Sequence, residues 1–183
     1  SNNTLSIMIL ILFIFTIISI IIMPLLVFAM ASGFENDVRF ETSVIYGRIA
    51  FPYIFFVSLS SLFAGILNSY GKFGVVSATP IFLNLFLIFA MILSYILDWE
   101  VGIMLSISIP LSGILQLIVL IHTTRKLGYF PKLKIPKFNG KIRKLLIIAL
   151  PAVLTGGVIH INLLVGRQIA SYYEGAIAWL NYA

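Results

Sequence analysis

Long uncharged, strongly apolar stretches make up most of the chain, and short clusters of charged residues separate them. The uncharged gaps cover residues 1–34, 49–71, 73–97, 101–124 and 145–166. An α-helix rises about 1.5 Å per residue, so about 20 apolar residues cross a hydrocarbon core about 30 Å thick. Every gap reaches that length, and the pattern therefore predicts five complete transmembrane helices.

The two ends of the chain add further expectations. A sixth predicted helix begins near Ala176 and has only eight residues before Ala183. The chain starts with Ser1 rather than methionine, so we expect an internal fragment of a larger protein. A secretory signal peptide is the alternative for the first gap, but this gap lacks a basic start and is longer than a signal's apolar region. A spanning helix is the favoured interpretation.

Composition agrees with a membrane protein. Hydrophobic residues make up 61% of the chain and charged residues 10%, and the mean hydropathy is +1.11. Soluble domains average about 45–50% apolar and about 25% charged residues. We therefore predict an all-α polytopic membrane protein. The chain has no cysteine, which fits a protein without disulfides or a cysteine-bound metal.

The charged clusters predict an orientation. The segment 125–144 contains no acid and holds eight of the twelve Lys and Arg residues. Cytoplasmic loops carry such an excess, so this segment and the amino end are expected in the cytoplasm. Alternation then puts Lys72 inside and the acidic 98–100 turn and 32–43 loop outside. The basic residues of the segment are Arg125, Lys126, Lys132, Lys134, Lys137, Lys141, Arg143 and Lys144.

The segment 125–144 has two interpretations. It mixes lysines with the aromatic residues Tyr129, Phe130 and Phe138, as in a nucleic-acid site. In a polytopic membrane protein, however, such lysines attract anionic lipid headgroups and the aromatics suit the interface. Glycines and prolines interrupt it, so we expect a surface linker with short helical pieces at most, bound to membrane lipids and not to nucleic acid.

Polar residues within the predicted spans distinguish a transporter from an anchor. Ser, Thr and Gly recur in the second to fifth spans, where packing between helices explains most of them. Asn68, Asn84 and Asn162 are stronger candidates for a wet cavity, because hydrocarbon offers an amide no partner. His160 is either a satisfied core histidine or a proton-sensitive group. No paired carboxylate, metal-ligand cluster or phosphate loop occurs, so we expect neither an enzyme nor a bound cofactor or metal.

The sequence "GRIAFPYIFFVSLSSLFAGILNSYGKF", followed by "SATPIFLNLFLI", resembles the MurJ (MviN) family of lipid II flippases, whose fourth helix has an R-I-x-F-P-Y start and a G-x-L-N-S/T end. The later "LPAVLTGGVIHINLLVGRQIASYYEGAIAWLNYA" is similar to the family's stretch into the eighth helix. The upstream "PLLVFAMASGF" is similar to the close of the third helix, so the resemblance covers essentially the whole chain.

The resemblance implies a fold and a function. Family members have fourteen helices in two lobes around a cationic cavity, in the bacterial cytoplasmic membrane. They move lipid II, a peptidoglycan precursor, to the outer leaflet by alternating access. Residues 1–124 would be helices three to six of the first lobe, residues 125–144 the linker, and residues 145–183 the start of the second lobe.

Some family features lie outside the chain or differ within it. The arginines considered essential in the family lie on its first two helices and in an A-D-R-L motif beyond Ala183. Gly166 stands where many relatives have an acid associated with ion binding, so the coupling ion stays open. A related polysaccharide-unit flippase, a drug/cation antiporter or a membrane scaffold are the alternatives.

Two arginines near the outer ends of their spans require an explanation. We expect Arg48 and Arg167 to shape the outer mouth of the cavity, with Glu174 as a charge partner for them. The alternative is that both side chains merely reach the membrane interface.

Overall fold

The computed structural model describes residues 2–34, 37–128 and 163–173, together with residues 147, 151, 157, 160 and 176. No strand occurs among these residues. They belong to two compact units, one formed by Ser1–Ile20 and Ile45–Ile135 and the other by Ile21–Val44 and Pro136–Ala183. The elements are α1 (Asn2–Ile21), α2 (Met23–Met30), the 3-10 helix η1 (Ser32–Phe34), α3 (Val38–Ala50), α4 (Tyr53–Ser69), α5 (Phe73–Leu97) and α6 (Val101–Lys126).

Among the described residues, four helical segments are long and apolar enough to cross a membrane. They are Asn3–Ile21, Val38–Ser69, Phe73–Leu97 and Val101–Lys126. The all-helical membrane fold is confirmed for the described residues, and the first four predicted spans each contain one of these segments or most of it. The predicted span 145–166 lies mostly outside the described residues, as does most of the helix predicted from Ala176.

The first gap is divided between two helices, whereas its length predicted a single one. α1 ends at Ile21 and α2 begins at Met23, with Pro24 in the first turn of α2. A proline has no backbone N–H, so Pro24 cannot donate to the carbonyl of Ile20 four residues earlier. The helical hydrogen-bond ladder is therefore interrupted where the sequence reads Ile-Met-Pro.

The predicted outer loop 32–43 is also too long. The structure places Ser32–Phe34 in η1 and begins α3 at Val38, so Arg39 lies in the first turn of a helix rather than in a loop. The Asp37 carboxylate accepts a hydrogen bond from the Arg39 backbone N–H at 3.0 Å. This is the contact of a helix N-cap, and it explains why α3 begins among charged residues. Pro52 then separates α3 from α4 and lies at the N-cap of α4.

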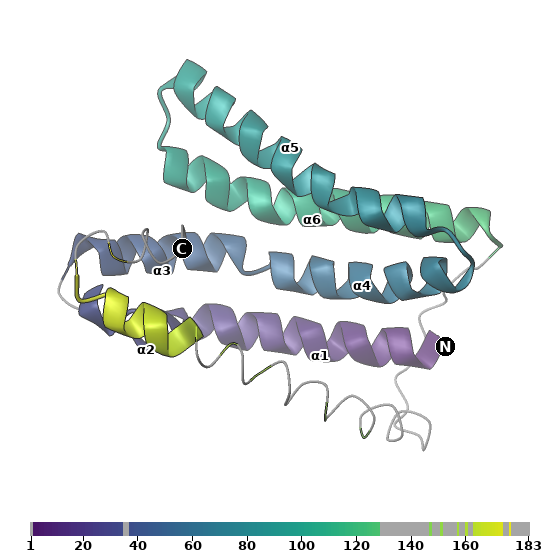
Figure 1. The fold of residues 1–183 in the computed structure, drawn as a ribbon, viewed down its shortest axis with the longest axis horizontal. Helices are drawn as coiled ribbons and strands as arrows, with labels where there is room; N and C mark the ends of the chain where they lie inside the picture. The colour runs from purple at the N-terminus through teal and green to yellow at the C-terminus, as the bar shows by residue number, and fades with distance from the viewer. Residues whose placement is uncertain are drawn as a thin grey trace. The chain divides into compact units, whose positions relative to one another are not determined.

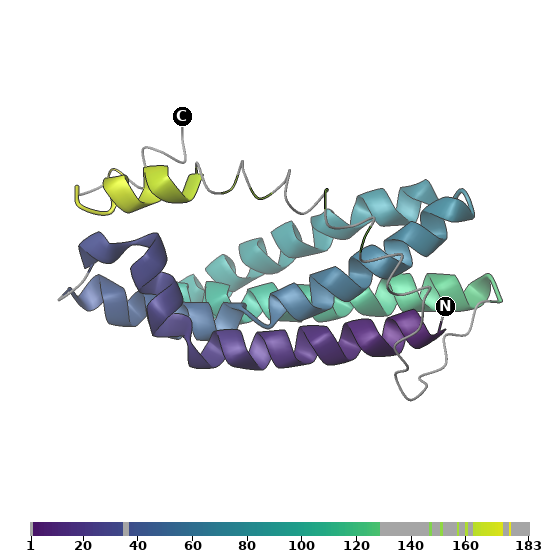
Figure 2. The same cartoon turned by 90° about the horizontal axis from the view of Figure 1, so that it is seen from below.

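The core of the first unit lies between α1, α4 and α6, which run side by side (Figure 1 and Figure 2). Leu59, Phe63 and Leu67 form one face of α4, at spacings that repeat every helical turn. Leu5 of α1 and Leu120 of α6 pack against this face. α5 crosses α6 at an angle (Figure 1) and keeps most of its surface outside the core.

The buried face of α6 is polar, whereas its exposed face is apolar. Ser106, Ser112 and Thr124 are buried, and each hydroxyl donates to a carbonyl of its own helix at 2.7 Å. Gly113 lies against Tyr53 and Phe56 of α4, so that a Cβ at this position would come within 2.8 Å of the Tyr53 ring. Small residues on the inside and large apolar residues on the outside are typical of helices that pack in lipid.

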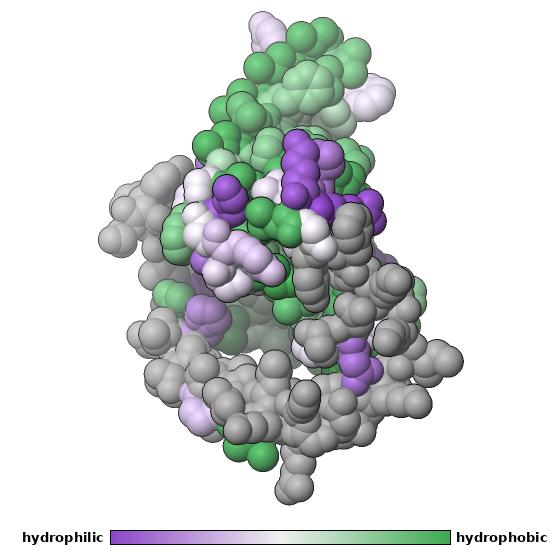
Figure 3. Space-filling model, turned by 90° about the vertical axis from the view of Figure 1, so that its right-hand side faces the viewer, coloured by the Kyte–Doolittle hydropathy of each residue, from purple (hydrophilic) through white to green (hydrophobic). Residues whose placement is uncertain are grey.

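Charged side chains gather at the ends of the helices. Gly71, with φ +71°, ends α4, where the N–H of Lys72 donates to the carbonyl of Leu67 at 2.9 Å. Figure 3 looks at the end of the first unit where α4 and α6 finish, and hydrophilic side chains are concentrated there while the apolar sides of the helices recede behind them. Asp98 and Glu100 lie in the turn between α5 and α6, at the opposite end of these helices.

Candidate functional site

A hollow of about 360 Å³ in the second unit contains two of the predicted site residues. His160 and Arg167 line it together with Leu163 and Leu164, and Met30 of α2 completes the wall. Residues 160, 163, 164 and 167 are spaced as neighbours on one face of a helix. The hollow therefore combines a permanent cation and an imidazole with an apolar lining.

A cluster of neutral polar residues lies beside this hollow. We call Ser32, Gly33, Gln168, Ser171 and Tyr172 the junction cluster. The N–H of Ser32 donates to Gln168 Oε1 at 3.2 Å, and Gln168 Nε2 donates back to Ser32 Oγ. Ser32 Oγ also lies 2.7 Å from the Tyr172 hydroxyl. The junction cluster thus joins segments that are far apart in the sequence.

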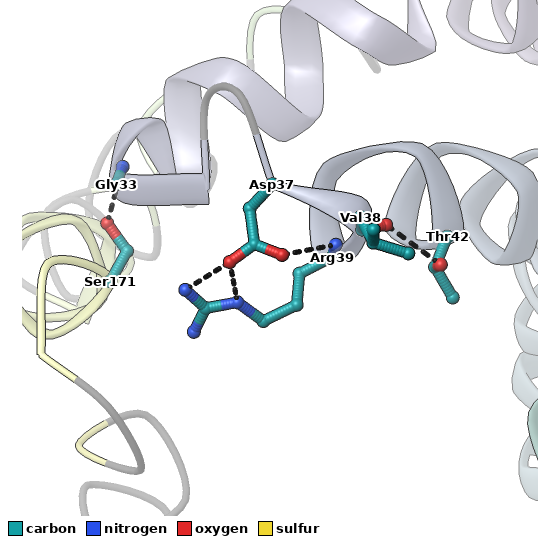
Figure 4. Close-up of polar contacts among 6 residues, drawn as sticks. All are labelled: Gly33, Asp37, Val38, Arg39, Thr42 and Ser171. Atoms are coloured by element: carbon teal, nitrogen blue, oxygen red, sulfur yellow. Dashed lines mark hydrogen bonds and ion pairs between the residues drawn. The ribbon is translucent and has the colours of Figure 1, made fainter.

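Gly33 brings the two backbones of the junction cluster into close contact. Its N–H donates to Ser171 Oγ at 3.0 Å (Figure 4). A Cβ on Gly33 would lie 2.5 Å from the carbonyl carbon and oxygen of Ser171. Ser171 is 1% exposed and Ser32 9% exposed, so the centre of the cluster is buried. Only glycine fits this approach without moving one backbone away from the other.

Arg39 forms an exposed ion pair instead of facing the hollow. Its guanidinium lies 2.5 Å from Asp37 Oδ2 (Figure 4). The same group lies 4.6 Å from the centre of the Phe34 ring. The Arg39 backbone N–H and then its side chain hydrogen-bond the carboxylate, and both lower the pKa of Asp37. The predicted outer turn therefore carries a charge that is already paired.

Arg48 contacts the break between α1 and α2. The side chain is exposed, and its Nε donates to the carbonyl of Ile20 at 3.2 Å. This is the carbonyl that Pro24 leaves without an intrahelical donor. A cation near the last carbonyls of a helix also interacts favourably with the helix dipole. The geometry thus gives Arg48 a local structural role.

The other predicted site residues are not among those that line the hollow. Asn68 is exposed at the end of α4, and Asn84 is exposed on α5. Both belong to the first unit, whereas the hollow belongs to the second. Asn162 and Glu174 lie outside the described residues, so the structure does not describe the predicted pairing of the arginines with Glu174.

The start of the predicted basic linker is helical. Arg125 and Lys126 form the last turn of α6 and are exposed. Gly128, with φ +78°, then ends the helix. The other six basic residues lie outside the described residues: Lys132, Lys134, Lys137, Lys141, Arg143 and Lys144.

Sequence reasoning did not find the junction cluster. Gln168, Ser171 and Tyr172 have the i, i+3, i+4 spacing of one helical face, and this was the available signal. Nothing in the sequence indicated Ser32 as their partner. A contact between the Tyr46 hydroxyl and Glu100 Oε1, which links α3 to the start of α6, was missed for the same reason. Among the described residues, no group of three His, Cys, Asp or Glu side chains is arranged to hold a metal.

Comparisons with known proteins agree over nearly the whole chain. The model of the family described as Lipid II flippase MurJ matches residues 1–183. A probable lipid II flippase MurJ of Rhizobium tropici is 39% identical over 178 residues, which cover 94% of this chain and 33% of that protein. The lipid II flippase MurJ of Burkholderia cenocepacia is 31% identical over 171 residues, which cover 86% of this chain and 32% of that protein. The chain spans about a third of the length of these relatives.

Proposed function

Because this chain belongs to the MurJ family of lipid II flippases, we propose that its protein moves lipid II from the cytoplasmic to the outer leaflet of a bacterial cytoplasmic membrane. The family match over residues 1–183 carries this proposal, and it confirms the resemblance inferred from the sequence. The protein is a transporter rather than an enzyme. Its substrate, undecaprenyl-pyrophosphate bearing a disaccharide-pentapeptide, has a headgroup that is too polar to cross hydrocarbon unaided.

Alternating access between two lobes is the proposed mechanism. Residues 1–124 supply helices three to six of a fourteen-helix fold, residues 125–144 link the lobes, and residues 145–183 begin the second lobe. The four consecutive candidate membrane spans support the first of these assignments. Alternating access requires helices that can bend, because the two lobes must open toward each side of the membrane in turn. The helix break at Pro24 and the interruption at Pro52 support such bending.

The distribution of charge supports one orientation. Lys72, Arg125 and Lys126 lie at the end of the first unit where α4 and α6 finish, and Asp98 and Glu100 lie at the other end of α5 and α6. Basic residues prefer the cytoplasmic side of a membrane. We therefore place the first end in the cytoplasm and the 98–100 turn outside. The basic linker 125–144 then rests on anionic lipid headgroups.

The hollow at His160 and Arg167 is the proposed contact with substrate in this part of the protein. A guanidinium binds two phosphate oxygens at once, which suits the pyrophosphate. Leu163, Leu164 and Met30 supply an apolar wall for the neighbouring isoprenoid carbons. Arg48 has no such setting, because its side chain contacts the Ile20 carbonyl.

Substitutions at Arg167 test this contact. In the full-length protein, Arg167→Ala is expected to slow lipid II translocation, and Arg167→Lys to recover part of the rate, because lysine keeps the charge but not the bidentate geometry. An Arg167→Ala protein that is as stable as the wild type and translocates at its rate would remove Arg167 from the proposed site.

Complementation tests the function as a whole. A bacterium depleted of its own lipid II flippase is expected to resume growth when the full-length protein is expressed. Expression at the same level of a relative that exports polysaccharide units provides the control. Continued arrest, with the protein present in the membrane, would favour the scaffold or another exporter function.

A further inference from the structure

The junction cluster and the hollow are neighbours along both segments that form them. Met30 of the hollow lies two residues before Ser32 of the junction cluster, and Arg167 of the hollow immediately precedes Gln168. The contacts that hold Ser32 on Gln168 therefore also hold Met30 near Arg167. If the two segments separated at the junction cluster, the wall of the hollow would open.

The chemistry of the junction cluster suits a contact that forms and breaks. All its hydrogen bonds join neutral groups: two hydroxyls to each other, an amide side chain to a serine, and a backbone N–H to a serine. Water can replace any of these partners when the surfaces part. Separating a buried ion pair would instead leave each charge without its partner, which requires much more free energy.

The close approach at Gly33 makes this contact specific. A Cβ would collide with the backbone of Ser171, which cannot move aside as a flexible side chain can. The contact is buried, since Ser171 is 1% exposed. The two segments therefore fit in one closed arrangement that a single methyl group would disrupt.

We propose that the junction cluster is a latch that holds the walls of the hollow at His160 and Arg167 together in one state of the transport cycle and separates in another. Ser32, Gly33, Gln168, Ser171 and Tyr172 form the latch, and Met30 and Arg167 move with its two sides. This inference rests on the proposed function, because it assigns the latch a place in the movement of lipid II.

Cross-linking tests the latch directly. Ser32→Cys and Gln168→Cys are introduced together into the full-length protein, after any cysteines outside this chain have been replaced. The chain itself has none. A short bifunctional thiol reagent, cleavable by reductant, is expected to abolish lipid II translocation in vesicles, and reduction to restore it. Undiminished translocation by the cross-linked protein would overturn the latch.

A control pair separates closure of the latch from chemical modification. Val38→Cys with Thr42→Cys lies within α3, where the Thr42 hydroxyl donates to the Val38 carbonyl at 2.9 Å (Figure 4). No movement between segments separates two positions on one helical turn. The same reagent is expected to leave translocation by this pair unchanged, and equal inhibition of both pairs would count against the latch.

Labelling provides a measurement that does not depend on lipid II. Ser171→Cys is expected to react slowly with a membrane-impermeant thiol reagent, and Gly33→Ala to accelerate the reaction by forcing the segments apart. Gly157→Ala is the matched control in the same unit, because no atom of the described residues lies within 4 Å of a Cβ there. Equal labelling in both backgrounds would overturn the closed contact. If the unmodified protein does not move lipid II, the proposed function fails while the labelling result still stands.

Discussion

The contact between Arg48 and the Ile20 carbonyl makes a quantitative prediction about the break between α1 and α2. Pro24 removes the N–H that would bond this carbonyl, and Arg48 Nε donates to it instead at 3.2 Å. Hydrogen bonds to charged groups contribute about 1.5–3 kcal/mol, whereas contacts between membrane helices average about 0.6 kcal/mol. Since Arg48 is exposed, we expect Arg48→Ala to lower the free energy of unfolding by about 1 kcal/mol.

A double-mutant cycle isolates this contact. Pro24→Ala restores an N–H that can donate to the Ile20 carbonyl within a continuous helix. In that background, Arg48→Ala is expected to leave the free energy of unfolding almost unchanged. The cycle then gives an interaction energy of about 1 kcal/mol between the two positions. Lysine has one flexible ammonium group in place of the guanidinium. The free energy of unfolding of Arg48→Lys is therefore expected to lie between those of the wild type and Arg48→Ala.

The assay is unfolding of the full-length protein in mixed micelles, with a denaturing detergent as titrant and helicity as the signal. Each of the four proteins in the cycle is measured at the same lipid content. The proposed contact is refuted if Arg48→Ala lowers the free energy of unfolding by the same amount in the wild-type background as in the Pro24→Ala background. It is also refuted if Arg48→Ala leaves the unfolding curve unchanged while abolishing translocation, because Arg48 would then act on the substrate.

Three further predictions concern packing and charge. Gly113→Ala is expected to destabilise the protein by about 1–3 kcal/mol, because its methyl group meets aromatic side chains of α4. Gly65→Ala is expected to be neutral or stabilising in the same unfolding assay, because no atom of the described residues lies within 4 Å of a Cβ there. Tyr46→Phe is expected to lower the stability of the protein by removing the hydrogen bond to Glu100, and an unchanged unfolding curve would contradict that contact. Since Arg39 lowers the pKa of Asp37 below its ordinary 3.8, the stabilising carboxylate is present at neutral pH and is lost only as the pH falls through the lowered pKa. Asp37→Asn is therefore expected to leave the shape of the curve of stability against pH unchanged between about pH 5 and 8, and a new pH-dependent step in that range would refute the assignment.

Hydropathy was sufficient to find the main membrane helices. α4, α5 and α6 coincide closely with uncharged gaps in the sequence. The reason is that an apolar segment of sufficient length is stable across a bilayer only as a helix. Their ends also carried local signals, such as Gly71 at the end of α4 and Gly128 after α6, where a positive φ is needed. These features depend on residues that are close together in the sequence.

Local chemistry changed the boundaries that hydropathy suggested. A long apolar run contained Pro24, which breaks the helical ladder regardless of hydropathy. A charged segment was predicted as a loop, but Asp37 caps α3 and starts a helix there. At Pro24 a backbone donor is missing, and at Asp37 a side-chain carboxylate accepts from a backbone N–H, so in both places a single hydrogen bond explains the helix boundary.

The candidate site was only partly predictable. His160 was proposed because polar groups are costly in an apolar helix, and Arg167 because a basic residue near the outer end of a span requires an explanation. Both side chains line the same hollow. Ser32 and Gln168 are small or neutral and lie far apart in the sequence, so nothing local indicated their contact. Their pairing follows from the close approach of two backbones at Gly33, which only a three-dimensional structure reveals.

The most direct test of the proposed function is translocation of lipid II by the purified full-length protein in vesicles. Labelled lipid II is placed in both leaflets, and its accessibility to an external reagent that reacts with the headgroup is followed over time. We predict that vesicles with the protein equilibrate lipid II between the leaflets, while empty vesicles and vesicles with an unrelated polytopic protein do not. Exchange no faster than in empty vesicles, with the protein folded and correctly inserted, would contradict the proposed function.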